Sequence, residues 1–359
     1  MNKTAIVGIQ GLPAQYGGFE TLAENLITHR HSPDIAYTVY CSTKDYPRRL
    51  SSYQGADLTY IPFLHANGIQ SIPYDILSLI HCILKGYDTL LVLGVSGCIF
   101  LPLLRLFFRK KLIINIDGLE HKRDKWGKFA KWFLRVSEAM AVKYADTIIA
   151  DNKGIQDYVR DTYHKPSVLI TYGGDHVIRH VAEEKQSALL QKMELNRKEY
   201  AIAVCRIEPE NNCHIILDAF AHTRQQLVFI GNWNRSPYGT HLKEKYSCHA
   251  NIRIMDSIYD LDTLYTLRQN ARLYLHGHSA GGTNPSLVEA MFFGIPILAY
   301  DVAYNRHTTC NQAAYFSNSQ QLQKLLEQPE PDGQSMLKIA RQHYLWKLII
   351  EQYESTILT

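Results

Sequence analysis

The feature that most constrains the fold of this chain is a regular alternation between short apolar runs and longer segments with helical spacing. Runs such as residues 4–9, 89–93 and 112–116 are mostly apolar, which is typical of strands buried on both faces of a parallel sheet. The alternation continues to about residue 171, pauses, and starts again at residue 200. Two consecutive βα series predict an α/β protein with two Rossmann-like, doubly wound domains.

The pause in this pattern predicts the domain boundaries. At 359 residues the chain is too long for one ordinary hydrophobic core and fits two domains of common size. We expect a Rossmann-like N-terminal domain over residues 1–174 and a Rossmann-like C-terminal domain over residues 175–334. Residues 335–359 are expected to form a helix that packs back toward the N-terminal domain.

The charge of the chain is small overall but concentrated in one region. A net charge of +4 is too low to indicate a nucleic-acid partner, and none is expected. Residues 105–135 nevertheless contain ten Lys or Arg against three acidic residues. This local excess indicates an anionic surface or substrate near that part of the protein.

Three further features describe the setting in which the protein works. The seven cysteines are scattered and odd in number, which favours reduced thiols in a cytoplasmic protein over a disulfide framework or a zinc site. The N-terminus enters a strand directly and has no signal-peptide shape. Residues 90–108 are apolar but interrupted by Gly, Pro and Arg, so we expect a buried strand and a helix rather than a membrane span.

The loop after the first strand is rich in glycine and could receive phosphate. Gly17 and Gly18 precede a helix whose N-terminus would offer unpaired N–H groups to an anion. A plain βα turn explains the same residues. The loop is not a GxGxxG sequence, and no carboxylate follows the second strand, which argues against a dinucleotide-dependent dehydrogenase.

The strongest local signal is a glycine-rich segment at residues 276–291. Asn284 is suited to cap a helix and Pro285 to occupy its first position. Glu289 would lie one turn further on the same side. We expect backbone amides at the helix start near residue 284 to hold a phosphate and the Glu289 carboxylate to accept hydrogen bonds from a ribose. A solvated Glu289 is disfavoured by its apolar neighbours.

Three stretches carry a resemblance to a known family: residues 11–20 (GLPAQYGGFE), 115–126 (NIDGLEHKRDKW) and 281–291 (GGTNPSLVEAM). With residues 172–175 and 344–346 they span nearly the whole chain. They resemble the retaining glycosyltransferases of family 4, of the two-domain GT-B type, in the bacterial polysaccharide branch identified as rhamnosyltransferases. The resemblance implies two domains facing across a cleft and a metal-independent hexosyltransferase without a cofactor. Its co-substrate would be a nucleotide-sugar.

Four positions depart from or match the pattern of that family. Glu289 matches the second of two glutamates, whereas Gly281 stands at the place of the first. Arg206 matches an arginine that neutralises the leaving diphosphate, and Asn211 occupies the position of its lysine partner. Lys243 or Lys245 could supply the missing cation.

The N-terminal domain departs from the pattern as well. Asp117 replaces a histidine that touches the donor sugar, and His121 replaces a tryptophan. Asp117 and Glu120 are therefore candidate acceptors for sugar hydroxyls, with capping of a helix as the alternative. The resemblance implies no protein nucleophile, because the departing phosphate oxygen deprotonates the acceptor on the same face.

These arguments give three sets of candidate residues. The catalytic candidates are Asp117, Glu120, Arg206 and Glu289. The donor-binding candidates are Gly17, Gly18, Arg206, Asn211, His278, Gly281, Gly282, Thr283, Asn284, Ser286 and Glu289. The acceptor-side candidates are His121, Arg123 and Trp126.

Other signals have simpler explanations or stay open. Asp260 and Asp262 match the DxD form of metal-dependent transferases but are better placed to cap a helix. His276 and His278 lack a third ligand, so no metal is expected. An apolar stripe formed by Trp126, Phe129, Ala130, Phe133 and Val136 beside several lysines fits either core packing or docking on an anionic bilayer.

The leading hypothesis is transfer of a sugar, such as L-rhamnose from its dTDP donor, to a polysaccharide or lipid-linked oligosaccharide. The expected setting is the cytoplasm, with peripheral contact at the inner face of the plasma membrane as an open question. A sugar-nucleotide epimerase of GT-B shape and a non-catalytic sugar-nucleotide-binding protein are the alternatives.

Overall fold

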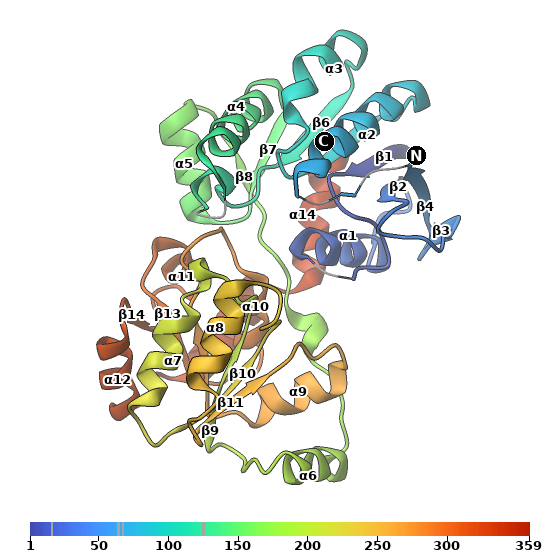
Figure 1. Cartoon of the computed structure of the whole chain (residues 1–359). Helices are drawn as coiled ribbons and strands as arrows, with labels where there is room; N and C mark the ends of the chain where they lie inside the picture. Colours follow the sequence, from blue (N-terminus) through green and yellow to red (C-terminus); the bar gives the residue numbers. More distant parts are fainter. Residues whose placement is uncertain (16, 63–64, 67, 124–125) are drawn as a thin grey trace. The chain divides into compact units, whose positions relative to one another are not determined.

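The computed structural model describes residues 1–15, 17–62, 65–66, 68–123 and 126–359. Tyr16, Asp124 and Lys125, which belong to the stretches singled out above, lie outside the described residues. The chain divides into two compact units, Met1–Tyr172 with Trp346–Thr359, and Gly173–Leu345 (Figure 1). Both are Rossmann-like α/β units, as the alternating pattern predicts.

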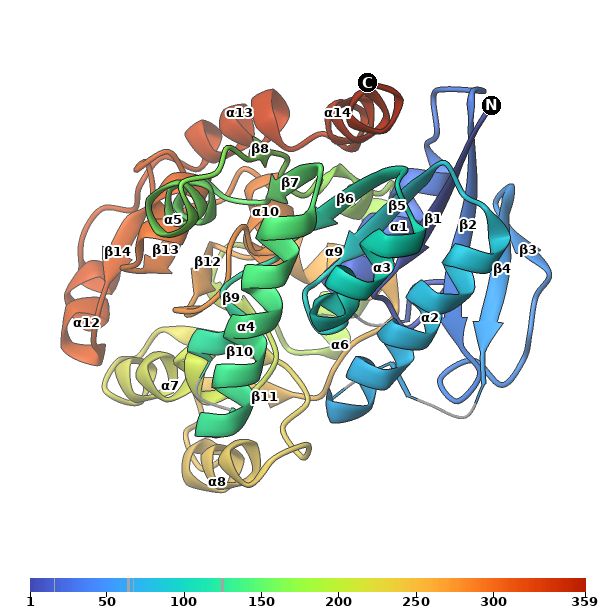
Figure 2. The same ribbon diagram turned by 90° about the horizontal axis from the view of Figure 1, so that it is seen from above.

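The first unit is built on an eight-stranded sheet in the order β3-β4-β2-β1-β5-β6-β7-β8. All neighbouring strands are parallel except β3 and β4. Helices α2, α3 and α4 lie on one face, and α1 packs with α14 on the other (Figure 2). The strands are β1 (Asn2–Val7), β2 (Ile35–Ser42), β3 (Ser52–Tyr53), β4 (Ala56–Ile61), β5 (Thr89–Leu93), β6 (Lys111–Asn115), β7 (Thr147–Ala150) and β8 (Val168–Leu169). The helices are α1 (Gly18–Thr28), α2 (Ser71–Lys85), α3 (Leu101–Phe107), α4 (Lys128–Tyr144), α5 (Lys153–Tyr163) and α14 (Trp346–Leu358).

The second unit is built on a six-stranded parallel sheet in the order β11-β10-β9-β12-β13-β14. Two clusters of buried apolar side chains cover its faces. The strands are β9 (Tyr200–Val204), β10 (Gln226–Ile230), β11 (Ile252–Met255), β12 (Leu273–His276), β13 (Ile297–Tyr300) and β14 (Ala314–Phe316). The helices are α6 (Glu183–Lys192), α7 (Cys213–Ala221), α8 (Pro237–Tyr246), α9 (Leu261–Asn270), α10 (Pro285–Met291), α11 (Ala303–Thr308), α12 (Ser319–Glu327) and α13 (Gly333–His343).

Each sheet has one point where the strand order reverses. In the first unit this point lies between β1 and β5, and in the second between β9 and β12. Ligands of open α/β sheets bind outside the carboxyl ends of the strands at such points. At the first point Gly8 is required, because its φ is +92° and a Cβ there would lie 2.1 Å from the Leu93 carbonyl oxygen.

The C-terminal segment forms two helices rather than the single helix expected. The break falls at Tyr344, whose carbonyl accepts a hydrogen bond from Gly174 N at 2.9 Å. Helix α13 belongs to the second unit and α14 to the first. The α14 residue Glu354 accepts hydrogen bonds from His31 N and Ser32 N at 2.9 and 3.0 Å, which fastens this helix within the first unit.

The apolar stretch 90–108 forms strand β5, a short 3-10 turn and helix α3, as the interrupted pattern predicts. Helix α3 is only seven residues long. Across the residues that the structure describes, no helix combines the length and the apolar character needed to cross a membrane.

Candidate functional site

The loops that follow β9 and β12 are joined at the point where the strand order of the second unit reverses. Asn212 donates its side-chain amide to the Gly277 carbonyl at 2.9 Å. Ser279 donates to the Glu210 carbonyl from its backbone N at 2.9 Å and its hydroxyl at 2.8 Å. The backbones also touch, since a Cβ on Gly277 would lie 2.2 Å from the Asn211 carbonyl oxygen. These contacts make the two loops one platform at the carboxyl edge of the sheet.

Arg206 and Asn211 play different parts in this platform. The Arg206 side chain is 40% exposed, with Nη1 3.9 Å from Glu208 Oε1. Asn211 is buried, and its side-chain amide donates to the Arg206 carbonyl at 2.7 Å. Asn211 therefore fixes the backbone from which Arg206 projects, and its contact with a donor stays a prediction.

The two lysines considered as substitutes for the missing cation have other contacts. Both lie near the C-terminal end of α8. Lys243 Nζ lies 3.6 Å from Asp256 Oδ1, and Lys245 Nζ lies 4.8 Å from the centre of the Tyr246 ring. Among the contacts of the described residues, neither lysine is in contact with Arg206.

The glycine-rich loop ends in the helix start that the sequence predicts. Asn284 Oδ1 accepts hydrogen bonds from Ser286 N at 3.2 Å and Ser286 Oγ at 2.9 Å, and Pro285 holds the first helical position. Helix α10 has seven residues. Gly281 has a φ of +121°, which side-chain-bearing residues rarely adopt, so a glutamate in this position would strain the loop. The departure from the family pattern thus agrees with the local backbone.

Glu289 is held in place by a buried arginine. Arg268 Nη2 lies 2.8 Å from Glu289 Oε2, and the Arg268 side chain is only 4% exposed. His176 Nε2 lies 3.6 Å from the other carboxylate oxygen. The junction glycine, Gly174, packs against the same helix turn, where a Cβ would lie 3.1 Å from Glu289 N. Glu289 is thus an oriented, half-buried carboxylate and not a solvated helix residue.

The hydroxyl of Tyr274 connects β12 with the end of β9. This buried residue donates to the Val204 carbonyl at 3.2 Å, two residues before Arg206. Further along β12, His276 is buried, and burial lowers its pKa to about 3, so its imidazole is neutral. The His276 and His278 rings stack at 4.3 Å, and the His278 carbonyl accepts from Asn305 Nδ2 at 2.9 Å. His278 is 8% exposed, and its predicted contact with the donor is not tested by these bonds.

The Asp-Leu-Asp sequence caps a helix, as predicted. Asp260 Oδ2 accepts a hydrogen bond from Thr263 N at 2.9 Å at the start of α9, and Asp262 pairs with Arg179 at 2.8 Å. Among the described residues, no group of three or more His, Cys, Asp or Glu is placed to hold a metal ion.

The first unit contains a cavity of about 470 Å³ at its own reversal point. Most of its wall is apolar, with Phe19, Trp126, Phe129 and Phe133 among the largest side chains. It is lined by Gly8, Phe19, Ala66, Gly68, Ser71, Ile72, Asp75, Leu93, Gly94, Val95, Ser96, Asp117, Glu120, Trp126, Phe129, Ala130, Phe133 and Leu134. Of the five residues of the apolar stripe, Trp126, Phe129, Ala130 and Phe133 line the cavity and Val136 does not.

Asp117 and Glu120, the two catalytic candidates of the first unit, both line this cavity, and their contact with a sugar stays a prediction. Glu120 is held by two neighbours, with Arg123 Nε 2.8 Å from Oε1 and Trp126 Nε1 donating to Oε2 at 3.0 Å. The capping alternative is wrong, because the N-cap of the 3-10 turn Glu120–Lys122 is Leu119 and that of α4 is Gly127. Carboxylate oxygens in this position can accept hydrogen bonds from sugar hydroxyls.

His121 lies outside the cavity lining and serves a buried cluster instead. Its Nδ1 lies 3.0 Å from Glu138 Oε2, and Tyr158 and Tyr163 donate to the other oxygen at 2.8 and 2.7 Å. Burial alone would raise the pKa of Glu138, but these hydrogen bonds outweigh it and hold the pKa below its ordinary value. His121 thus anchors the acceptor-side loop to α4.

The sequence reasoning did not find Asp75, which is the most deeply buried carboxyl group of the cavity. It is 5% exposed and accepts a hydrogen bond from Ser96 Oγ. Burial raises its pKa to about 7, although the Ser96 bond acts in the opposite direction. Asp75 lies four residues after Ser71 on α2. The sequence gives only a weak signal for it, which is an acidic residue on an otherwise apolar helix face.

Gly17 and Gly18 have a structural explanation beside the predicted one. A Cβ on Gly17, whose φ is +129°, would lie 2.0 Å from Glu20 Oε2. Glu20 turns back to accept a hydrogen bond from Gln10 N at 2.9 Å, and burial raises its pKa. Gly17 therefore makes room for Glu20, and neither glycine lines the cavity. Their contact with a donor stays a prediction.

Comparison with family models divides the chain in two. Residues 1–175 match the model described as a domain of unknown function (DUF1972), and residues 185–343 match the model described as glycosyl transferases group 1. No curated protein matches the sequence.

Several solved structures share the fold across both units. Sucrose-phosphate synthase from Thermosynechococcus elongatus has a TM-score of 0.81 at 16% identity over 99% of this chain and 98% of the other. HepE from Anabaena, solved with UDP, has a TM-score of 0.75 at 15% identity over 99% of both chains. A candidate UDP-N-acetylglucosamine 2-epimerase from Listeria monocytogenes has a TM-score of 0.62 at 12% identity, over 99% of this chain and 95% of the other.

These likenesses confirm the predicted α/β architecture with two parallel-sheet, Rossmann-like domains. The group 1 match covers the unit that carries the joined β9 and β12 loops. Residues 185–343 thus match a glycosyl transferases group 1 domain, within a two-domain fold that the solved structures share.

Proposed function

We propose that the protein is a retaining, metal-independent glycosyltransferase that moves a hexosyl group from a nucleotide-sugar to a polysaccharide or lipid-linked oligosaccharide. The observation that carries the proposal is the platform formed by the β9 and β12 loops. It joins the Arg206 loop to the loop that leads into α10, at the point where strand order reverses. HepE, of the same fold, was solved with UDP-glucose.

The donor would bind with its diphosphate at the loop of residues 281–283 and its ribose at Glu289. Glu289 suits this role because Arg268 fixes one carboxylate oxygen at 2.8 Å, so the group is already oriented before the ribose arrives. Preorganised groups lose little freedom on binding. Arg206, which is exposed, would neutralise the charge that develops on the departing diphosphate.

The acceptor would enter the cavity of the first unit. Its carboxyl groups, on Asp75, Asp117 and Glu120, can bind sugar hydroxyls. The apolar remainder of the wall suits a lipid or the apolar face of a sugar ring. With no protein nucleophile assigned, a phosphate oxygen of the leaving nucleotide would take the acceptor proton on the face from which it departs.

The identity of the donor is proposed from the family resemblance, which favours L-rhamnose carried by dTDP. A panel of UDP- and dTDP-sugars tests it, with released nucleotide measured in the presence and absence of a lipid-linked saccharide acceptor. We expect one donor to give acceptor-dependent release and a product with the anomeric configuration retained. Inversion of that configuration, or no release with any donor, would contradict the proposal.

The same panel separates the alternatives. An epimerase, a reaction assigned to one structural neighbour, would convert the donor sugar without any acceptor. A non-catalytic binding protein would be thermally stabilised by a nucleotide-sugar but release no nucleotide. The cytoplasmic setting stays a prediction, which fractionation of cells that express the protein would check.

A further inference from the structure

The exposed apolar side chains of this protein are concentrated on three helices of the first unit. Among the described residues, eight of the fifteen exposed large hydrophobic side chains lie on α2, α3 and α4. They are Leu77, Ile80, Leu84, Leu103, Leu106, Phe107, Phe129 and Trp132. We call the surface formed by these eight residues the apolar face. Phe107 is 73% exposed and Leu106 65%, so a structural role in the core does not explain them.

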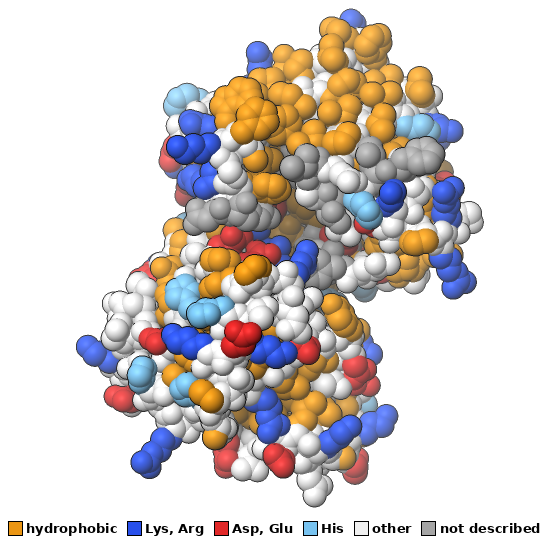
Figure 3. Space-filling view, viewed as in Figure 1, with side chains coloured by type: hydrophobic (Ala, Val, Ile, Leu, Met, Phe, Trp, Pro, Cys, Tyr) orange, Lys and Arg blue, Asp and Glu red, His pale blue; other side chains and the backbone are white. Residues whose placement is uncertain are grey.

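The three helices are neighbours on one side of the sheet. Helix α3 packs against both α2 and α4. Figure 3 shows hydrophobic side chains gathered over these helices on one side of the first unit. Apolar patches of this kind on a protein surface mark sites that bind another protein or a membrane.

The charge on the same helices has a single sign at the surface. Helices Ser71–Lys85, Leu101–Phe107 and Lys128–Tyr144 are fully described, and their only carboxyl groups, Asp75 and Glu138, are buried. The exposed charges on these helices are cations, and the exposed carboxylate Asp146 just after α4 is paired with Arg105. The exposed cations on or just after the helices include Lys85, Arg109, Lys128 and Arg135. Near the edge, Asp88 pairs with Lys110.

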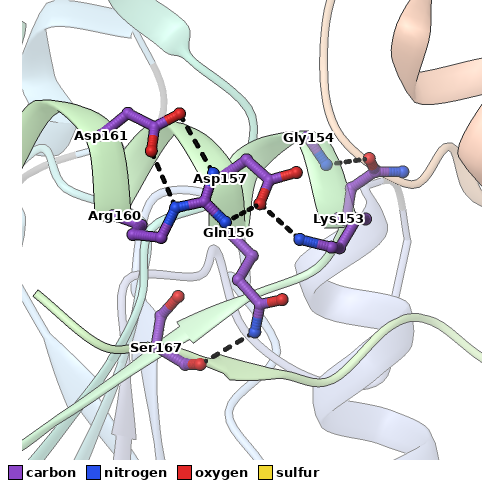
Figure 4. Close-up of polar contacts among 8 residues, drawn as sticks. Lys153, Gly154, Gln156, Asp157, Arg160, Asp161 and Ser167 are labelled. Carbon is purple, nitrogen blue, oxygen red and sulfur yellow. Dashed lines mark hydrogen bonds and ion pairs between the residues drawn. The ribbon is translucent and has the colours of Figure 1, made fainter.

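Helix α5 of the same unit shows the contrast with an ordinary solvated helix. Arg160 lies 2.7 Å from Asp157 and 2.8 Å from Asp161, and Lys153 also pairs with Asp157 (Figure 4). Both signs of charge are mixed there and neutralise each other. The three fully described helices of the apolar face carry surface cations but no surface carboxylate, so their charge favours an anionic partner.

The apolar face also adjoins the cavity of the first unit. Phe129 is 76% exposed and at the same time lines the cavity. The cavity wall next to it is apolar, through Trp126, Phe133 and Leu134. A molecule that is anchored in a lipid layer, with that layer lying against the apolar face, would therefore reach the cavity without crossing bulk water.

We infer that the apolar face of α2, α3 and α4 docks on an anionic lipid surface, and that the cavity receives an acceptor saccharide presented on a lipid anchor. A helix surface with aromatic and aliphatic side chains flanked by Lys and Arg is suited to the boundary between headgroups and acyl chains. This inference rests on the proposed function for the nature of the acceptor, but the docking itself does not. A second copy of the chain is a poorer occupant, because two such faces would bring like charges together.

Vesicle flotation tests the docking directly. We expect the full chain to float with vesicles of phosphatidylcholine that contain about one third phosphatidylglycerol, and weakly or not at all with phosphatidylcholine alone. The double variant Leu106→Gln/Phe107→Gln should lower the partition coefficient by about tenfold or more. Arg135→Gln should lower it about fivefold, because one cation near an anionic surface contributes roughly that factor.

The matched control is Tyr259→Gln/Leu261→Gln, which removes two exposed hydrophobic side chains from the second unit and should leave flotation unchanged. Equal flotation of the two double variants would overturn the inference, as would failure of the wild-type chain to float with the anionic vesicles. Concentration-dependent association that is abolished by Leu106→Gln/Phe107→Gln, without flotation, would assign the face to a second copy instead.

A second readout separates this inference from the proposed function. Leu106 and Phe107 do not line the cavity, so their double variant should keep the wild-type rate of donor hydrolysis in the absence of vesicles. It should lose turnover of a lipid-linked acceptor in vesicles. Flotation without any nucleotide release would refute the proposed function while supporting the docking.

Discussion

Replacing Asp75 by Asn should change how the stability of the first unit depends on pH. The Asp75 carboxyl is buried against Ser96 and Gly97, and its pKa rises from an ordinary value of 3.8 to about 7 on folding. The folded protein therefore holds a proton that the unfolded chain releases. Stability falls as pH rises through this range and is lowest above pH 7.

The size of the effect follows from these two pKa values. Between about pH 5 and pH 8, ionisation of Asp75 should lower the free energy of unfolding by about 3 kcal/mol. An asparagine side chain in its place cannot ionise, and its amide oxygen can still accept a hydrogen bond from Ser96. The free energy of unfolding of Asp75→Asn, relative to wild type, should therefore rise by about 3 kcal/mol over the same interval.

Urea unfolding followed by tryptophan fluorescence measures this difference. Trp126, Trp132 and Trp346 belong to the first unit, and Trp233 is the one tryptophan of the second. In a Trp233→Phe background the signal reports the first unit alone. An identical pH dependence for Asp75→Asn and its parent would refute the reasoning.

Asp88 provides a control of opposite sign. Its hydrogen bonds with Lys110 and with the Lys3 backbone lower its pKa, so the stability it contributes is present at neutral pH and lost as pH falls. Asp88→Asn should therefore be most destabilising at neutral pH and least destabilising below about pH 4. The same dependence for both variants would mean that neither reports its own carboxyl group.

Three further predictions concern the donor platform. Arg268→Met should weaken nucleotide-sugar binding and destabilise the second unit by about 2 kcal/mol. Part of the lost stability should return in the double variant Arg268→Met/Glu289→Gln. Strictly additive effects of the two substitutions on stability would contradict the pairing of Arg268 with Glu289. Arg206→Ala should lower kcat more than donor affinity, as steady-state kinetics and isothermal titration would show, with the reverse pattern arguing against charge stabilisation on the leaving group. Gly281→Ala should cost about 1 kcal/mol or more because of the positive φ, read from Trp233 fluorescence, and no loss would contradict the strained loop.

Much of the fold could be predicted because its signals are local. Apolar strand runs and helical spacing identified both sheets, and the caps Asn284 and Asp260 depend only on residues within one turn. The end of α13 at Tyr344 was missed, because the contact that marks it comes from Gly174, far away in sequence. Helical periodicity continues through that point and gives no sign of the break.

The parts of the candidate site that depend on local backbone structure could be predicted from the sequence. The side-chain contacts between residues far apart in the sequence were missed. Arg268 and Asp75 lie on buried helix positions, and only the packed structure shows that one meets Glu289 and the other faces a cavity. The ring of His121 is directed to Glu138 of α4 and does not line the cavity, and its place on the acceptor side stays a prediction. Adjacent positions in a loop do not determine which way each side chain points.

The central claim is that a nucleotide's diphosphate meets the loop of residues 281–283 while its ribose meets Glu289. A crystal structure of the protein with UDP or dTDP, whichever protects it more from thermal unfolding, tests this most directly. We expect the diphosphate within hydrogen-bonding distance of that loop and of Arg206, and a ribose hydroxyl bound to Glu289. A nucleotide bound elsewhere, with Glu289 contacting only Arg268 and His176, would contradict it.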